Sequence, residues 1–173
     1  MIIPGLKLIK LKVINNLISE KHQIQPAGVE LTLKDVEEFE DAGYIDLTNA
    51  KRKVSTCRKL SFDEEGKIHL SQGAYKVRFN EVICVPEDMV GIGLPRSSLL
   101  RSGATILSAV WDPGYKGRSE SLLVVFNPKG IILERNARLM QIIFIKLSRR
   151  PHKLYSGIYL GENVEEKKIR SLS

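Results

Sequence analysis

The sequence predicts an all-β fold, either a β-sandwich or a jelly-roll-like barrel with few short helices. Its apolar residues fall in short runs of strand length, and turns that contain Gly or Pro separate these runs. Some segments alternate apolar and polar residues, as half-buried strands do. A chain of 173 residues is long enough to bury its own core, so we expect one domain over residues 1–173.

Five segments carry the strand pattern. Residues 76–79 alternate, and residues 81–86 end in a Pro-Glu-Asp turn. Residues 122–126 form a continuous apolar run before an Asn-Pro-Lys-Gly turn, and residues 130–134 follow as the next strand. Residues 139–145 are expected to be a fully buried strand because of their high Ile and Phe content.

Two helices are expected beside these strands. One lies near the N-terminus, around residues 10–20, and the other is a short turn at residues 97–101. The start of the helical turn at residues 97–101 would gather backbone N–H groups that can face an anion. The acidic segment 34–41 and the loop through Glu65 are expected at the surface.

The formal net charge of +7 is compatible with a nucleic-acid partner, but the basic residues are spread along the chain and aromatic residues are only 6% of it. We therefore expect no nucleic-acid binding. Short basic runs such as residues 51–53 and 149–150 fit solvated loops. A positively charged protein also attracts small anionic substrates such as nucleoside triphosphates. The charge does not decide between these interpretations.

The two cysteines, Cys57 and Cys84, have no CxxC partner, so we expect inert thiols in a reducing compartment. Together with three scattered histidines they make no zinc-ligand spacing, which excludes a zinc-dependent deaminase and predicts no protein metal site. The apolar N-terminus is interrupted by Pro4 and several lysines, too short and too charged for a membrane span. A cytoplasmic protein without membrane contact is expected.

The stretch from Pro95 to Gly117 concentrates groups that suit phosphate chemistry. Arg96 offers a planar fork of donors for phosphate oxygens, and Ser97 and Ser98 add hydroxyls in the same turn. Asp112 precedes a Pro-Gly turn that can aim a carboxylate into a cleft. Taken singly, the serines could be a helix N-cap and Asp112 an ordinary turn residue. Together they suggest attack by water on a phosphate ester.

The same stretch carries a family resemblance. PRSSL at 95–99 and VWDPGYKG at 110–117 resemble motifs II and III of the trimeric dUTPase and dCTP deaminase superfamily. QPAGVEL at 25–31 resembles the first motif, ARLMQI at 137–142 the fourth, and YSGIYLG at 155–161 the C-terminal segment of the deaminases. The resemblance implies a distorted jelly-roll-like β-barrel of the dUTPase-like type. It also implies a homotrimer with active sites at the subunit interfaces.

The resemblance assigns phosphate contacts to the second and fourth motifs. In the family, the PRS turn holds the triphosphate of a nucleotide that is bound mostly by a neighbouring subunit. Arg96, Ser97 and Ser98 occupy this turn, and Arg101 matches a second arginine of the deaminase pattern that could instead form a surface salt bridge. Gln141 of the fourth motif would be a further phosphate contact. Mg²⁺ would be bound through the triphosphate, with little protein ligation.

The resemblance assigns the remaining roles to the third motif and the C-terminal segment. Asp112 would be catalytic, orienting and activating the attacking water, while Tyr115 would pack under the deoxyribose and exclude a 2′-hydroxyl. Residues 152–173 would form a lid over the nucleotide, with Tyr155 and Tyr159 as substrate contacts. Uracil would be read by the main chain of Ala109, Val110 and Trp111.

The chain departs from the deaminases after Gly117. Deaminases carry a Glu in the next strand that moves protons at the base, and alignment puts Leu122 or Val124 at that position. Glu120 is the nearest carboxylate but lies two or more residues early. A one-residue register shift turns a side chain to the other face, whereas an even shift keeps it on the same one. Glu30 also replaces the usual Asp of the first motif.

The sequence therefore predicts a dUTP diphosphatase, which converts dUTP and water to dUMP and pyrophosphate. A dCTP deaminase, or a bifunctional deaminase and diphosphatase, is the first alternative. It is favoured by the RSSLLR pattern and the C-terminal motif, and opposed by the missing Glu. A catalytically silent nucleotide-binding jelly-roll protein is the second, and Asp112 opposes it.

Overall fold

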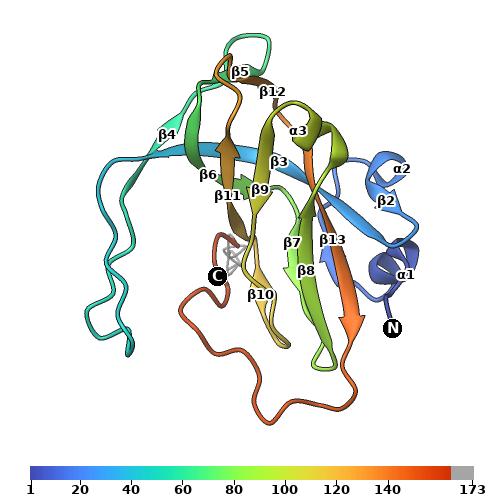
Figure 1. Ribbon diagram of the computed structural model, residues 1–173. Helices are drawn as coiled ribbons and strands as arrows, with labels where there is room; N and C mark the ends of the chain where they lie inside the picture. The colour runs from blue at the N-terminus through green and yellow to red at the C-terminus, as the bar shows by residue number, and fades with distance from the viewer. Residues whose placement is uncertain (165–173) are drawn as a thin grey trace, which may run out of the picture.

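A computed structural model describes residues 1–164 of the chain (Figure 1). It confirms the predicted all-β class, since strands make up most of its regular structure and the helices are short. The helices are α1 (Gly5–Lys10), α2 (Glu20–Gln23) and α3 (Ser97–Arg101). Among the described residues no helix is long and apolar enough to cross a membrane.

The main sheet has the strand order β8-β13-β3-β6-β11-β9, with β2 and β4 also pairing with β3. Its strands are β2 (Ile24–Gln25), β3 (Gly28–Phe39), β4 (Cys57–Leu60), β6 (Gly73–Phe79), β8 (Met89–Pro95), β9 (Ala104–Leu107), β11 (Glu120–Val125) and β13 (Arg138–Lys146).

The long strand β3 joins the two halves of this sheet. Its first part pairs with β13 through residues 29–32, and its second part pairs with β6 through residues 33–38. The register shifts between Leu33 and Asp35, where a bulge or irregularity interrupts the pairing with β6. Because bulges bend a strand and increase its twist, the sheet can curl around the core at this point.

Two smaller sheets complete the structure. Strands β1 (Ile14–Asn15) and β10 (Lys116–Gly117) both pair with β7 (Val82–Cys84), and β5 (Lys67–Leu70) pairs with β12 (Ile131–Glu134). The three-stranded sheet matters for the site, because β10 fixes the end of the Asp112 turn to β7.

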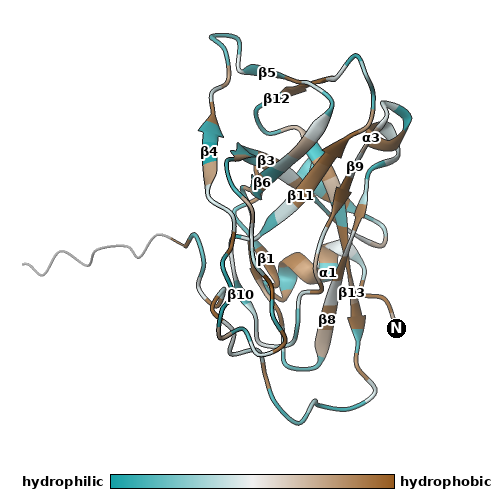
Figure 2. Ribbon diagram, turned by 60° about the vertical axis from the view of Figure 1, so that its left-hand side comes forward, coloured by the Kyte–Doolittle hydropathy of each residue, from teal (hydrophilic) through white to brown (hydrophobic). Residues whose placement is uncertain are grey.

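Alternation along the strands separates the core from the surface. On β11, Leu123 and Val125 are buried, whereas Glu120, Leu122 and Val124 lie on the other face and are half-buried. The core also contains Phe79 and Phe144, both fully buried. Figure 2 shows that β11 and β9 are largely apolar strands and that β4 is more hydrophilic.

Residues 40–56 connect β3 to β4 as a long arm that projects from the barrel (Figure 1). A bridge between Tyr44 and Lys53 holds its two sides together. Two apolar side chains lie at its far end, where Ile45 is 76% exposed and Leu47 is 100% exposed.

Three local predictions were wrong. The expected helix at 10–20 is instead the end of α1, strand β1 and the start of α2, because Lys12 and Asn16 adopt left-handed backbone angles of 55° and 62°. The acidic segment 34–41, expected at the surface, is exposed only at residues 39–41, and residues 34–39 form the second half of β3. Its Asp35 is only 4% exposed, since Lys59 and Arg78 lie 2.6 and 3.4 Å from its carboxylate.

The third error concerns β13, which is buried on one face only. Ile142 and Phe144 are fully buried, but Ile143 and Ile145 are half-buried on the other face. The predicted strands at 76–79, 81–86, 122–126 and 130–134 are confirmed in position, as is the helix at 97–101.

Candidate functional site

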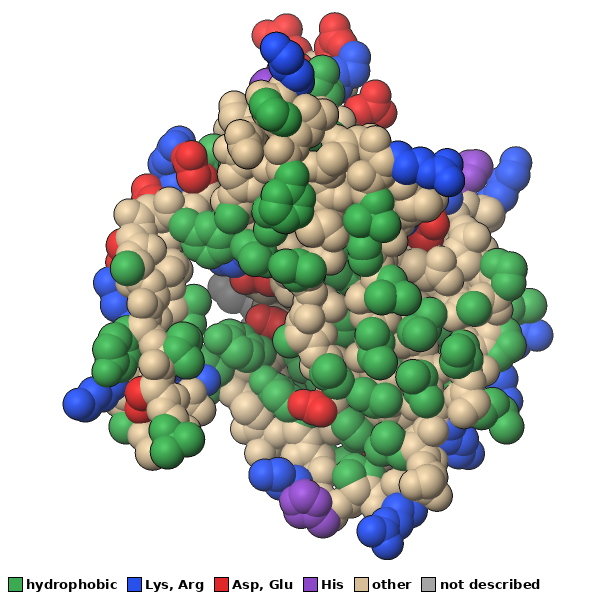
Figure 3. All heavy atoms as spheres, viewed as in Figure 1, with side chains coloured by type: hydrophobic (Ala, Val, Ile, Leu, Met, Phe, Trp, Pro, Cys, Tyr) green, Lys and Arg blue, Asp and Glu red, His purple; other side chains and the backbone are tan. Residues whose placement is uncertain are grey.

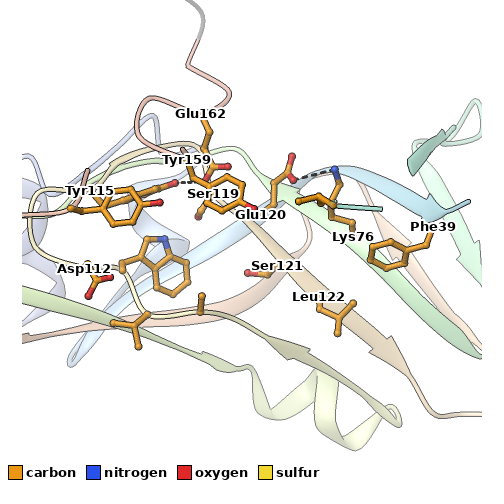
Figure 4. Close-up of a pocket in the computed structure, with 15 residues that line it drawn as sticks. Phe39, Lys76, Asp112, Tyr115, Ser119, Glu120, Ser121, Leu122, Tyr159 and Glu162 are labelled. Carbon is orange, nitrogen blue, oxygen red and sulfur yellow. Dashed lines mark hydrogen bonds and ion pairs between the residues drawn. The ribbon is translucent and has the colours of Figure 1, made fainter. Parts of the chain in front are cut away.

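A cavity of about 420 Å³ lies where the Asp112 turn, β11, β6 and the C-terminal segment meet (Figure 4). Figure 3 shows the surface hollowed between the arm and the barrel, with acidic side chains inside the hollow. The lining residues come from several separate parts of the chain and are Phe39, Val54, Lys76, Ala109, Val110, Trp111, Asp112, Tyr115, Ser119, Glu120, Ser121, Leu122, Tyr155, Tyr159 and Glu162.

Asp112 lies at the rim of this cavity, on a rigid turn. Trp111 before it forms a backbone bridge with Gly91 of β8, with N–O distances of 2.9 and 3.0 Å. Gly114 has a φ of 86°, a conformation that favours glycine, and the N–H of Tyr115 donates to the carbonyl of Asp112 at 3.1 Å. Within residues 1–164 the carboxylate of Asp112 has neither a hydrogen-bond donor nor an ion-pair partner. It is therefore available to a water molecule.

Tyr115 forms the wall beside Asp112 and is only 6% exposed. Its hydroxyl donates to Oε1 of Glu162 at 2.7 Å. The rings of Tyr115 and Tyr155 pack in a T-shaped arrangement with 5.7 Å between centroids. Burial and the neighbouring Glu162 carboxylate raise the pKa of Tyr115, so the hydroxyl remains a donor at neutral pH. Burial also raises the pKa of Glu162, opposed mainly by its hydrogen bond from Tyr115.

The C-terminal segment, residues 155–163, folds back onto the third motif of its own chain. The N–H of Tyr155 donates to the carbonyl of Pro113 at 2.8 Å, and that of Gly161 donates to the carbonyl of Lys116 at 2.7 Å. Arg118 donates its own N–H to the carbonyl of Glu162 at 2.9 Å. These bonds bring Tyr155 and Tyr159 to the cavity. The rest of the predicted lid, residues 165–173, lies outside the described residues.

Glu120 lies in the same cavity, on the face of β11 that also carries Leu122. Because Glu120 and Leu122 are two residues apart on one strand, the carboxylate lies on the face where a deaminase would need its Glu. Lys76 binds one of its oxygens at 3.1 Å, and Arg78 binds the other at 3.0 Å. Asn163 donates to the second oxygen at 3.2 Å. A carboxylate bonded in this way is poorly arranged for moving protons at a base.

Two buried serines lie in the cavity wall between these groups. Ser119 is 4% exposed and Ser121 is 7% exposed. Among the described residues no hydrogen-bond partner meets either hydroxyl oxygen. Buried polar groups are nearly always paired, so a water molecule or a polar ligand in the cavity would complete the hydrogen bonding of these two hydroxyls.

The predicted phosphate contacts lie elsewhere. Arg96 donates from Nε to Oε1 of Glu30 at 2.7 Å, and Arg138 donates to the other oxygen at 2.8 Å. Ser97 and Ser98 begin α3, Arg101 ends it in an exposed position, and Gln141 pairs with Glu30 across β13 and β3. None of the predicted phosphate-binding side chains lines the cavity. One chain therefore carries two separate groups of predicted site residues.

The sequence predicted the cavity residues of the third motif and the two C-terminal tyrosines, but it missed Lys76, Ser119, Ser121 and Glu162. Lys76 and the serines belong to ordinary strand patterns, and nothing in their spacing shows which cavity they face. Glu162 follows the last motif directly, which is the one signal that pointed near it.

No cluster of three or more His, Cys, Asp or Glu side chains is arranged to hold a metal ion within residues 1–164. Cys57 and Cys84 are free thiols, and burial raises the pKa of both.

Comparison with known proteins gives a consistent result. Residues 6–147 match the family model described as dCTP deaminase-like. A relative from Methanosarcina mazei, named probable deoxyuridine 5′-triphosphate nucleotidohydrolase, is 49% identical over 91% of this chain and 93% of its own length. A relative from Methanocaldococcus jannaschii, named deoxyuridine 5′-triphosphate nucleotidohydrolase, is 43% identical over 82% of this chain and 90% of its own.

A solved structure, the 2′-deoxycytidine 5′-triphosphate deaminase of Agrobacterium tumefaciens, has the same fold. It superposes with a TM-score of 0.62 at 21% identity, covering 83% of this chain and 47% of that one. The present chain thus matches about half the length of that protein.

Proposed function

The chain belongs to the dCTP deaminase-like family, and we propose that it is a dUTP diphosphatase, which converts dUTP and water to dUMP and pyrophosphate. Relatives at 43–49% identity carry the name of this activity. The observation that carries the proposal is the unpaired carboxylate of Asp112 at the rim of a cavity beside Tyr115. Leu122 faces the same cavity close to where a deaminase needs its Glu.

Asp112 acts on the attacking water. Its carboxylate accepts a proton from the water while the water oxygen bonds to the α-phosphorus, opposite the oxygen that leads to the β-phosphate. The bond from the α-phosphorus to that oxygen breaks, and pyrophosphate leaves with its electron pair. This role is supported by the rigid backbone around the Asp112 turn, since a water must be held in line with the leaving group.

Tyr115 and the cavity wall select the nucleoside. The buried ring of Tyr115 packs under the deoxyribose and leaves no room for a 2′-hydroxyl. The main chain of Ala109, Val110 and Trp111 reads uracil. The unpartnered hydroxyls of Ser119 and Ser121 support a polar base nearby, because each lacks a partner within the described residues.

The phosphate contacts come from a neighbouring copy in a homotrimer. Two observations support this arrangement. The Arg96 turn and Gln141 do not line the cavity of their own chain. A patch of exposed apolar side chains also covers the face that carries β8, β9 and α3 (Figure 3). Its members are Ile92, Leu94, Leu100, Leu107 and Val110, between 36% and 56% exposed.

Mg²⁺ would be bound through the nucleotide triphosphate. Among the described residues, Asp112 is the one cavity carboxylate without a partner, and it acts on the attacking water. The ion would therefore be held mainly by substrate phosphates and water, as suits Mg²⁺. The ion would neutralise charge that develops on the phosphates. Arg96, Ser97, Ser98 and Gln141 of the neighbouring copy would bind the same oxygens.

Product analysis tests the proposal. The protein is incubated with Mg²⁺ and either dUTP or dCTP, and the products are separated and identified. We expect dUMP and pyrophosphate from dUTP and no ammonia from dCTP. Deaminated product from dCTP would favour the bifunctional alternative, for which the position of Glu120 in the cavity is the specific support. Binding of dUTP without any turnover would favour the silent nucleotide-binding protein.

A further inference from the structure

Glu162 is the one acidic group of the C-terminal segment that contacts a proposed substrate-binding side chain. It lies beyond residues 6–147, which match the family model, and it lines the cavity. Its Oε1 accepts the hydroxyl of Tyr115 at 2.7 Å (Figure 4). Tyr115 has no other hydrogen-bond partner for its side chain among the described residues.

The position of Glu162 is fixed from both sides. Its carbonyl accepts the N–H of Arg118 at 2.9 Å, and its N–H donates to the carbonyl of Tyr159 at 3.2 Å. Gly161 before it has a φ of 80° and donates to the carbonyl of Lys116 at 2.7 Å. Asn163 after it donates to the carbonyl of Arg118 at 3.1 Å. The backbone therefore aims the carboxylate at the Tyr115 hydroxyl.

We propose that Glu162 is a positioning residue that holds Tyr115 against the cavity and so sets the preference for deoxyribose over ribose. This inference rests on the proposed function, because it concerns the sugar of the same substrate. Tyr115 excludes a 2′-hydroxyl only while its ring stays where the structure has it. The edge contact with Tyr155 limits one side of the ring, and the hydrogen bond to Glu162 fixes the hydroxyl end.

Through Glu162, the C-terminal segment would help to select deoxyribose over ribose. A buried hydroxyl without an acceptor is unfavourable, so loss of the carboxylate would turn the Tyr115 ring toward water or another acceptor. Either movement enlarges the space at the 2′-position. Glu162 itself would not contact the reacting phosphate.

The test compares kcat/KM for dUTP and for UTP in the full chain and four variants: Glu162→Ala, Glu162→Gln, Tyr115→Phe and Glu162→Ala with Tyr115→Phe. We expect Glu162→Ala to reduce the ratio of the two constants by about tenfold, mainly through better use of UTP. Glu162→Gln should keep most of the ratio, since its amide oxygen still accepts from the hydroxyl. In the double variant the Tyr115→Phe change has already removed the hydroxyl, so adding Glu162→Ala should hardly change the ratio further.

Asn163→Ala is the matched control. It removes the hydrogen bonds from the Asn163 side chain to the carbonyl of Arg118 and to Glu120, and it leaves the pair of Tyr115 and Glu162 in place. We expect Asn163→Ala to have a ratio of kcat/KM for dUTP to kcat/KM for UTP near that of the wild type. An equal loss of selectivity in Asn163→Ala and Glu162→Ala would overturn the proposal, because docking of the segment alone would then be responsible. An unchanged ratio in Glu162→Ala would overturn it as well.

Failure of the proposed function gives a different result. If the wild type hydrolyses neither nucleotide, the diphosphatase assignment fails. Calorimetric dissociation constants for α,β-imido analogues of dUTP and UTP then measure sugar selection without turnover. The inference about Glu162 stands if Glu162→Ala brings the dissociation constants for the two analogues closer together, and it fails if the difference between them is unchanged.

Discussion

Arg96 and Arg138 share a single carboxylate, that of Glu30, with one arginine on each of its oxygens. Glu30 is only 7% exposed, whereas the two arginine side chains are 26% and 32% exposed. The longer side chain of Glu, where the family usually has Asp, lets one buried group reach both cations. The pair leaves a net positive charge beside α3, which suits a triphosphate.

Glu30→Gln should therefore impair both stability and substrate affinity. Two neighbouring cations would lose their shared counter-charge, so we expect a loss of about 1–3 kcal/mol in the free energy of unfolding. KM for dUTP should rise because Arg96 is no longer held in one orientation. Urea denaturation and steady-state kinetics measure the two effects. Glu65→Gln is the control, since its carboxylate is exposed and, within residues 1–164, pairs only with Lys67. Equal changes of stability and KM in Glu30→Gln and Glu65→Gln would contradict the role of Glu30 in holding Arg96.

Asp112→Asn should keep nucleotide binding and lose turnover. Asn has nearly the same shape but cannot accept the proton of the attacking water, so kcat should fall by about 10²–10⁴-fold. Affinity should hold or rise slightly, because one negative charge near the triphosphate is removed. Pyrophosphate release and calorimetry with a non-hydrolysable dUTP analogue give the two quantities. Turnover within a few-fold of the wild type would show that Asp112 only shapes its turn.

Ser121→Ala should move stability and affinity in opposite directions. The buried hydroxyl has no partner in the described chain, so its removal should raise the free energy of unfolding by about 1 kcal/mol. If the hydroxyl binds the base, KM for dUTP should rise in the same variant. Thermal unfolding with and without the dUTP analogue separates these effects. A more stable protein with unchanged KM would remove Ser121 from the substrate site.

Replacing Tyr115 with Ala should bring the kcat/KM values for dUTP and UTP closer together. The wild type should prefer dUTP because the ring fills the space at the 2′-position. Competition assays with both nucleotides in one reaction measure the preference directly. A wild type that uses UTP as well as dUTP would show that the ring has no such role.

Glu81 should make stability depend on pH. It is fully buried and accepts hydrogen bonds from Gln23 and Thr32, yet burial raises its pKa above the ordinary value of 4.5. The folded state then binds this proton more tightly than the unfolded state. The contribution of Glu81 to stability is present below pH 4.5, and it is lost as the pH rises through the pKa of Glu81 in the folded state. The free energy of unfolding should therefore fall over that range.

Glu81→Gln tests this by comparison with the wild type in urea at a series of pH values. The difference between the two proteins should change with pH above 4.5 and then level off. A constant difference across the series would mean that Glu81 does not titrate differently in the two states.

Local patterns predicted much of the fold. Alternation placed the strand at 76–79, and the motif at 110–117 placed Asp112 and Tyr115 in one cavity. The errors arose where distant residues decide the structure. The acidic composition of residues 34–41 indicates a surface segment, but Lys59 and Arg78, on two other strands, neutralise Asp35 and allow a central strand. Sequence spacing does not show such pairing across strands.

The site was predicted only in part, again because contacts between distant residues decide the rest. Tyr155 and Tyr159 could be assigned from a motif, whereas the contact of Glu162 with Tyr115 depends on how the segment turns at Gly161. The Arg96 turn was recognised, but a single chain does not bring it to Asp112. In the proposed homotrimer, a neighbouring copy would bring it to the cavity.

The separation of Arg96 from the cavity of its own chain has a genetic consequence in the proposed homotrimer. A copy defective at Arg96 still supplies a sound Asp112 to the site it shares with a neighbour, and a copy defective at Asp112 still supplies a sound Arg96. Two alleles that are each inactive would therefore complement one another when expressed together, because some mixed trimers contain a site built from the intact half of each. Two alleles with defects in the same half would not.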